Sequence, residues 1–504
     1  MAGYPYLPGT TVDLADLGLK IAPPPAGPKV TLLGYTSNTG VPINEPLTVT
    51  NIGKVISSLY TVYPSGTGLG ELAMAVDEAS SAGAENIEIV VIGHLTGTGA
   101  ASDSIDPTNS GGQATRLADL SGAYEVIMQT DLSVVSPVNA WFDAKSANFG
   151  KQLADFCHQA SDEADTAVIG IIPTMNPVEW AHAYSGDLTG VASISGEVSG
   201  ITDSSDYLFG LPSLELMNEW VKYVTQHGSP AVGTGVIPTA FDNFLAGSED
   251  TAGSFDPLDD ESSDTAVNSD YFTSWQATSL DGSAAVDSKG NKVDAGRRLC
   301  VFAAPLTRTS TYIKDIAAAH GAAISNTFYN TNGAAAYSAM ITTLAPQSAP
   351  TNKPLYTVKP LRKLSPSQAN TLTARRLTTM HTRSNGFVVT SAVTGAHNLS
   401  KYVRSDFVRL TTVRIVDSVI KIIRSVADKY IGEPNTAAAR NAMANEIEKF
   451  LKNMRVAQAL NDWKMFISAT PDQQVLGEAT IDLTLVPAFE LVKIQTNISL
   501  AKNL

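Results

Sequence analysis

Residues 409–451, RLTTVRIVDSVIKIIRSVADKYIGEPNTAAARNAMANEIEKFL, decide the fold of the C-terminal part of the chain. Apolar residues recur there at the three- and four-residue spacing of helices that bury one face. Between them, Gly432 and Pro434 break the pattern, and Asn435 or Thr436 is suited to cap a following helix. The stretch predicts a first helix from about Asp406 to Tyr430 and a second that runs to about Leu460.

Each predicted helix has an apolar stripe, and the first also has a mixed-charge face. The stripe of the first helix comprises Val408, Ile415, Val419, Ile422 and Val426. Its opposite face comprises Arg414, Asp417, Lys421, Arg424 and Asp428. The stripe of the second helix comprises Ala439, Met443, Ile447, Phe450, Met454 and Ala457. Alternating charges three or four residues apart support each other and are typical of helices that face protein.

The sequence that follows these helices alternates apolar and polar residues, as strands do. Ile481, Leu483 and Leu485 form one such run, Pro487 interrupts it, and a second run follows. The apolar positions of the second run are Val492, Ile494, Thr496, Ile498 and Leu500. A strand at the end of a chain needs a sheet edge, and it is free to find that edge on another molecule. We expect these five residues to pair between subunits.

Residues 30–355 have the pattern of a mixed α/β (α+β) region. Short apolar runs are VTLLGY (30–35), IEIVVIG (87–93), TAVIGII (166–172) and LCVFAAP (299–305). Helical patterns at 68–82 and 147–160 separate them. Continuous apolar strands between helices predict a sheet buried on both faces.

Two segments lack the pattern of a packed element. Residues 1–29 contain six prolines, which fix φ and remove amide donors, so this stretch is expected to be an extended arm. No Lys or Arg occurs between Lys222 and Lys289, and residues 243–270 are acidic and rich in Ser, Gly and Pro. Asp256, Asp259, Asp260 and Asp264 suggest a calcium loop, but the glycine and terminal glutamate of an EF-hand are missing. An exposed acidic insertion is the favoured interpretation.

Charge is strongly segregated along the 504 residues, whose formal net charge is -15. Residues 1–352 carry 13 basic and 38 acidic side chains, whereas residues 353–464 carry 19 basic and 7 acidic ones. Such a distribution gives a folded chain a basic and an acidic face, which orients partners. The expected partner of the basic part is an acidic surface.

Motifs of catalysis, metal binding and secretion are weak or missing. Cys157 and Cys300 are far apart, and the N-terminal residues resemble no signal peptide, which predicts a cytoplasmic site of synthesis. The glycines at 66–70 lack the Lys of a phosphate-binding loop. Cys157 and His158 lie about 100° apart on a helix, so we expect a buried cysteine beside a surface histidine. The sequence predicts no enzyme, no metal site and no cofactor.

The stretch at 409–451 and ATIDLTLVPAFELVKIQTNISL at 479–500 resemble the C-terminal end of contractile phage tail sheath proteins, a family also found in related contractile injection systems. The order of parts is similar as well. Such proteins begin with an arm like YPYLPGTTVDLADLG and continue through segments like AGAENIEIVVIG and GRRLCVFAAP. The resemblance implies a structural subunit that polymerises as stacked hexameric rings around a tail tube and contracts to drive the tube through a cell envelope.

The family also implies roles for the regions of the chain. The arm (1–29) and the C-terminal strand (489–504) would be exchanged between neighbouring subunits, 30–355 would form the outer region, and 356–488 would form the inner domain facing the tube. Partners would be other copies of the chain, the tube protein, the baseplate and the tail terminator, with no nucleic acid and no membrane insertion. The protein would be assembled in the host bacterial cytoplasm and located in the virion tail. Candidate tube contacts are Arg414, Lys421, Arg424, Arg440, Lys449, Lys452 and Arg455.

A nucleic-acid-binding protein or an enzyme that uses the basic domain is the alternative function. The basic block lacks the interleaved aromatic residues that stack on single strands, and its first helix carries almost as many acids as bases. The sheath subunit is therefore the favoured prediction.

Overall fold

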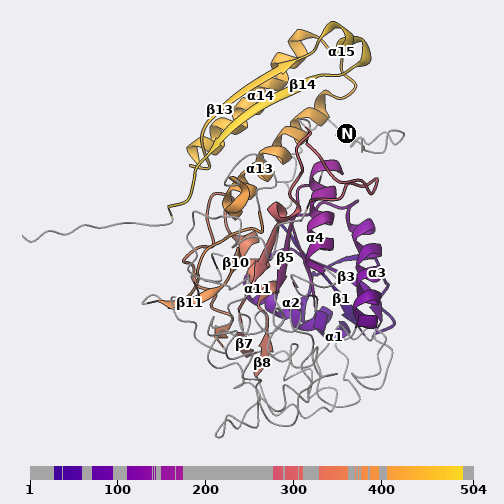
Figure 1. Cartoon of the computed structure of the whole chain (residues 1–504), viewed down its shortest axis with the longest axis vertical. Helices are drawn as coiled ribbons and strands as arrows, with labels where there is room; N and C mark the ends of the chain where they lie inside the picture. Colours follow the sequence, from indigo (N-terminus) through magenta and orange to yellow (C-terminus); the bar gives the residue numbers. More distant parts are fainter. Residues whose placement is uncertain are drawn as a thin grey trace, which may run out of the picture. The chain divides into compact units, whose positions relative to one another are not determined.

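The protein divides into two compact units in a computed structural model (Figure 1). One unit comprises residues 1–344 and 350–408, and the other comprises 345–349 and 409–504. The structure describes residues 28–36, 38–59, 71–94, 110–138, 140, 142, 149–164, 166–173, 276–287, 290–304, 306–309, 328–360, 369, 373, 376–383, 386–396 and 406–491. The N-terminal arm, residues 66–70, the acidic insertion at 243–270 and residues 492–500 were predicted features that fall outside these ranges.

A seven-stranded sheet forms the centre of the first unit, in the order β10-β6-β5-β4-β1-β3-β2. Its strands are β1 (Val30–Thr36), β2 (Pro46–Thr48), β3 (Ile87–His94), β4 (Val134–Pro137), β5 (Ile169–Pro173), β6 (Leu299–Phe302) and β10 (Leu377–Thr378). All neighbours are parallel except β2, which pairs antiparallel with β3 at one edge. The four apolar runs predicted from the sequence are β1, β3, β5 and β6, so the mixed α/β class is confirmed.

Helices cover both faces of this sheet (Figure 1). On one face, α3 (Ser110–Ile127) and α4 (Phe149–His158) pack against alternate strand residues such as Leu33 and Val90. On the other face, α1 (Ile52–Leu59), α2 (Glu71–Ser81) and α11 (Ala334–Thr343) pack against the intervening residues, such as Leu32 and Ile89. Since successive strand residues point to opposite faces, an unbroken apolar run supplies both cores.

Close packing of α4 on the sheet depends on a glycine. A Cβ at Gly170 of β5 would lie 2.7 Å from Cγ of Leu153 on α4, closer than carbon atoms approach. The glycine therefore lets α4 lie directly on β5 and bury Cys157.

Smaller elements complete the first unit. A three-stranded sheet comprises β7 (Leu306–Thr309), β8 (Phe328–Thr331) and β9 (Lys359–Pro360). A hairpin comprises β11 (Met380–Arg383) and β12 (Gly386–Val389). Single turns are the π-helical η1 (Gln159–Glu163), η4 (Ala295–Arg298) and η5 (Asp406–Val408). The unit extends to Val408, beyond the expected boundary at 355, because β10 belongs to the central sheet.

A buried cluster of charges joins α2 to β7, β8 and α11. Arg308 Nη2 lies 3.0 Å from Asp77 Oδ2 and 2.6 Å from Ser81 Oγ. The neighbouring Glu78 carboxylate accepts a hydrogen bond from Thr331 Oγ1 (2.6 Å) and another from the amide of Ala336 in the first turn of α11 (3.3 Å). Burial raises the pKa of Glu78, although these hydrogen bonds and the Arg308 charge oppose the rise.

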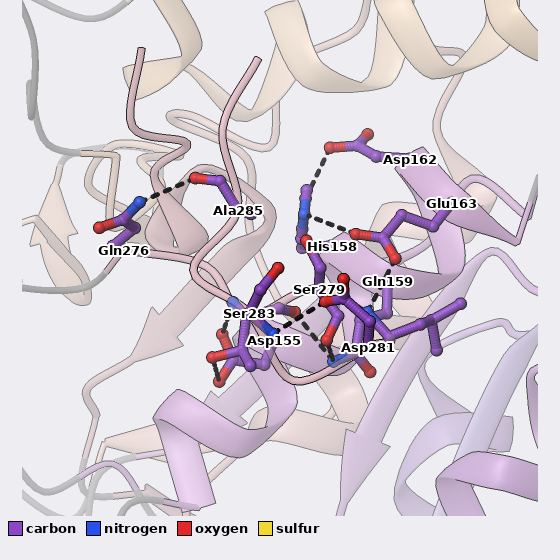
Figure 2. A network of polar contacts seen from close by, with 12 residues as sticks. Asp155, His158, Gln159, Asp162, Glu163, Gln276, Ser279, Asp281, Ser283 and Ala285 are labelled. Atoms are coloured by element: carbon purple, nitrogen blue, oxygen red, sulfur yellow. Dashed lines mark hydrogen bonds and ion pairs between the residues drawn. The ribbon is translucent and has the colours of Figure 1, made fainter. Parts of the chain in front are cut away.

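A second polar network fastens residues 276–298 to the end of α4 (Figure 2). Figure 2 shows His158 between Asp162 and Glu163, with Nδ1 2.7 Å from Asp162 Oδ2. Arg297 and Arg298 form ion pairs with the same Asp162 carboxylate, and Glu163 Oε2 accepts from the amide of Leu280 (2.8 Å). His158 is buried, so the prediction of a surface histidine was wrong. The segment that this network fastens to the end of α4 lies about 120 residues further along the chain.

The Asp162 carboxylate stabilises the first unit in a pH-dependent manner. Burial alone would raise the pKa of Asp162, but the His158 hydrogen bond and the two arginine charges outweigh it and hold the pKa below its usual range. A lowered pKa stabilises the fold above the unfolded value, near 4, and this contribution is lost as the pH falls.

We expect Asp162→Asn to lower the free energy of unfolding at pH 7 by about 2 kcal/mol, because charged hydrogen bonds are lost. The difference from wild type should shrink below about pH 4, where the wild-type carboxylate becomes protonated. Urea unfolding between pH 7 and pH 3 measures this difference, and Glu125→Gln, at an exposed position of α3, is the control. A difference that stays constant across this range would contradict the charge assignment.

The second unit is a pair of helices packed on a β-hairpin. The helices are α13 (Leu410–Ala427), extended by the single turn η6 (Asp428–Tyr430), and α14 (Ala437–Val456). The hairpin comprises β13 (Leu460–Ser468) and β14 (Thr480–Pro487), joined through α15 (Pro471–Leu476). Thr436 caps α14 by accepting from the Ala439 amide, as the sequence suggested. The second helix ends four residues before its predicted end, and β13 was not predicted.

Candidate assembly interface

The hairpin of the second unit is an amphipathic two-stranded sheet. One face packs against α13 and α14, whose buried residues include Ile415, Val419, Ile447 and Leu451. The packed face of the hairpin comprises Trp463, Met465, Ile467, Ile481, Leu483 and Leu485. These side chains are partly buried, and with the buried residues of the two helices they form one apolar core that holds the hairpin from one side.

Both long edges of this hairpin lack a partner strand within residues 406–491. β13 and β14 pair only with each other there, in an antiparallel register that sets Lys464 opposite Thr484 and Phe466 opposite Asp482. An edge strand presents a row of amide and carbonyl groups that can pair with an added strand. The hairpin can therefore grow at either edge by strand addition.

The turn of the hairpin is built from strong local signals. Thr470 Oγ1 caps α15 by accepting a hydrogen bond from the Gln473 amide, and Gln473 Oε1 accepts one from the Thr470 amide. Gly477 ends the helix in the left-handed region, with φ at 76°. Asn435 Nδ2 donates to the Glu478 carbonyl (2.8 Å), which joins this turn to the α13–α14 connection.

The residues that follow β14 are anchored to the same unit. The Ala488 amide donates to the Ala459 carbonyl (3.0 Å). Glu490 Oε1 lies 3.2 Å from Arg409 Nη1, and its other oxygen accepts from Thr411 Oγ1. The chain therefore stays with its own unit as far as Glu490. The exchanged-strand residues Val492, Ile494, Thr496, Ile498 and Leu500 lie outside the described residues.

The structure divides the seven candidate tube contacts into three groups. Arg414 is only 8% exposed, and its Nη1 donates to the carbonyl of Ser348 (3.1 Å) in the segment that crosses from the first unit. The expectation that Arg414 lies on the outward face of α13 was wrong, because this distant segment covers it. Asp417 is also buried.

The remaining basic residues lie at two separate places. Lys421 and Arg424 are half-buried in the second half of α13, and Arg440 is half-buried with its Nη1 on the Asn435 side chain (2.7 Å). Exposed basic residues cluster instead near the C-terminal end of α14: Lys449, Lys452 and Arg455. Since α13 and α14 are antiparallel neighbours, the two predicted sets do not form one patch.

The described residues form neither a metal-ion site nor a membrane-spanning helix. No group of three or more His, Cys, Asp or Glu side chains is placed to bind a metal ion in the ranges given above. Among the described helices, none is long and apolar enough to cross a membrane.

The fold of the chain is similar to that of chains in solved contractile assemblies. A chain of the anti-feeding prophage baseplate, a 6-fold symmetrised cryo-EM structure, superposes with a TM-score of 0.52 at 9% identity, covering 94% of this chain and 93% of that one. A chain of the PVC sheath complex, an extracellular contractile injection system in its contracted state, gives 0.51 at 9% identity, covering 94% and 92%.

Comparison by sequence adds no relative. No protein-family model matches the chain, and no curated protein matches it. The structural similarity extends over nearly the whole length of both chains, at an identity where only the fold persists. The protein has the fold of a contractile sheath subunit.

Proposed function

We propose that this protein is a structural subunit of a contractile sheath, which polymerises as stacked hexameric rings around a tube. Contraction of these rings would drive the tube through a target envelope. The observation that carries the proposal is the amphipathic hairpin at the end of a sheath fold, whose two edges are open within the described residues. A hairpin held on one face by helices can accept strands from neighbours without unfolding its own core.

The chain ends supply the strands in this proposal. Residues 492–504 and the proline-rich arm at 1–29 would add to hairpins of neighbouring subunits and link the rings. Main-chain pairing persists when flexible connectors allow the bodies to rotate, so the links would survive contraction. The partners would be further copies of the chain, the tube protein, the baseplate and the terminator.

Electron microscopy of the purified protein tests the proposal. We expect negatively stained samples to contain tubes or rings, and mass measurement in solution to give species larger than one chain. A monodisperse monomer at high concentration, with or without tube protein, would refute the proposal.

The tube contact is proposed to be electrostatic and to involve Lys421 and Arg424. We expect Lys421→Glu/Arg424→Glu to weaken co-sedimentation with tube protein at low salt while the melting temperature stays close to wild type. High salt should reduce the difference, because ions screen the attraction between oppositely charged surfaces. Arg414 is omitted because its burial would confuse tube binding with folding.

The matched control reverses two exposed lysines of the first unit, Lys54→Glu/Lys292→Glu, which should bind the tube as wild type does. Equal binding by the Lys421→Glu/Arg424→Glu variant and wild type at low salt would remove α13 from the tube contact.

A further inference from the structure

The second unit is a rod with chemically different ends. The 20 residues of α14 span about 30 Å, and the hairpin runs beside them. We call one end the tip, comprising residues 432–436 and 470–480, which the Asn435–Glu478 hydrogen bond joins. We call the other end the base, comprising residues 449–459 and 487–491, which the Ala488–Ala459 hydrogen bond joins.

The tip is acidic and carries exposed apolar side chains. Glu433, Asp472 and Glu478 are exposed, and the tip contains no Lys or Arg. Two basic residues flank the tip in sequence: Arg440 is half-buried with its guanidinium bonded to Asn435, and the exposed Lys429 forms an ion pair with Glu446. Val475 is 87% exposed and Leu476 is 72% exposed at the end of α15.

The base has the opposite charge and a second exposed apolar group. Lys449, Lys452 and Arg455 are exposed there, and Val456 is 85% exposed beside them. Phe489 and Leu491 are also exposed at this end. Three carboxylates lie nearby and weaken but do not cancel the charge: Glu448 pairs with Lys452, Glu490 pairs with Arg409, and Asp462 is exposed on β13.

From this complementarity we propose that the tip of one copy docks on the base of the next copy, in a head-to-tail contact. Val475 and Leu476 would pack against apolar side chains of the base, and the tip carboxylates would face its lysines and Arg455. A tip-to-tip contact would instead bring like charges together, which is unfavourable. A head-to-tail contact between identical chains repeats, and it closes into a ring when the rotation allows.

This contact rests on the proposed sheath function, and it names a surface that strand exchange does not require. It also assigns the basic end of α14 to another subunit rather than to the tube. Exposed apolar groups surrounded by charge are typical of protein interaction surfaces.

Two charge-reversal variants test the contact in the full-length protein, without tube protein. The tip variant is Glu433→Lys/Asp472→Lys/Glu478→Lys, and the base variant is Lys449→Glu/Lys452→Glu/Arg455→Glu. We expect each alone to raise the concentration needed for self-association by at least about tenfold, measured by sedimentation velocity at low salt. Circular dichroism checks that each variant is folded.

An equimolar mixture of the two variants should restore self-association to near the wild-type concentration. In the mixture, the reversed tip meets the reversed base, while the unchanged base meets the unchanged tip. The matched control is Glu45→Lys/Glu85→Lys/Glu125→Lys, three exposed acids of the first unit, which should assemble as wild type does. Val475→Ser/Leu476→Ser tests the apolar part without changing charge and should also weaken self-association.

Wild-type behaviour of either reversal alone would overturn the head-to-tail contact, and so would defective variants that mixing does not rescue. In either case the wild-type protein still assembles, so the sheath proposal is unaffected. If wild type does not self-associate at any concentration, it is the sheath proposal itself that fails.

Discussion

Removal of residues 492–504 is expected to abolish tube formation while both compact units remain folded. Strand exchange requires this segment to pair with an open hairpin edge of a neighbour, and a buried backbone group left unpaired costs about 1–3 kcal/mol. The cut follows Leu491 because the Glu490 carboxylate binds Arg409 and Thr411, so a cut after Pro487 would also damage the subunit. Circular dichroism checks the fold, and negative-stain microscopy scores the tubes.

Two full-length variants distinguish the effect of lost backbone pairing from the effect of deleting the segment. Ile494→Pro/Ile498→Pro removes two amide donors, whereas Ile494→Val/Ile498→Val keeps every backbone group. We expect the proline pair to form no tubes and the valine pair to form them normally. Regular tubes from the proline pair or from the truncated protein would show that this segment is not exchanged. Deletion of residues 1–20 tests the other terminus in the same way.

The helices of the second unit could be predicted closely from the sequence. Their apolar spacing, the break at Gly432 and Pro434, and the cap at Thr436 are local features, and the structure places α13, η6 and α14 where these features indicate. The apolar runs of the first unit were equally informative, because a strand buried on both faces has few polar positions.

The strand β13 was not predicted because its alternating pattern is imperfect. Trp463, Met465 and Ile467 form the packed face of the strand, but the exposed Phe466 lies between two of them and breaks the alternation of apolar and polar residues. The preceding helix was extended too far because its end depends on Gln458, whose φ is 61°. A glutamine in the left-handed region is not a recognisable stop signal.

Burial of individual polar residues could not be predicted from local spacing. Arg414 donates to the carbonyl of Ser348, and the two carboxylates beside His158 bind a segment that returns more than about 110 residues later. Helical periodicity distinguishes the faces of one helix, but it does not predict which of those faces a distant segment of the chain covers. Local patterns were therefore enough to predict the fold, whereas the exposure of individual site residues on amphipathic helices required the tertiary structure.

The buried ion pair of the first unit is expected to produce the largest loss of stability. We expect Arg308→Met to lower the free energy of unfolding at pH 7 by about 3–5 kcal/mol, because it leaves buried carboxylates without their counter-charge. Arg308 and Asp77 are 4% and 1% exposed at their side chains, and Glu78 is adjacent. Urea unfolding measures the change, and Lys54→Met on the exposed face of α1 is the control, expected within about 0.5 kcal/mol of wild type.

The pH dependence of the Arg308→Met variant distinguishes an electrostatic cause from a packing cause. Burial already raises the pKa of Glu78, and the Arg308 charge is among the effects that oppose the rise, so removing the arginine should raise that pKa further. A raised carboxyl pKa favours the folded state at low pH and loses this advantage as the pH rises through the folded-state value. The loss of unfolding free energy in Arg308→Met should therefore be smaller at pH 5 than at pH 7, whereas the loss caused by a cavity would be the same at both.

The double variant Asp77→Asn/Arg308→Met should lose less unfolding free energy than the sum of the two single variants, since the neutral amide no longer needs the guanidinium. If the losses of unfolding free energy are additive, or if the loss in Arg308→Met does not change with pH, Arg308 stabilises the unit through packing alone.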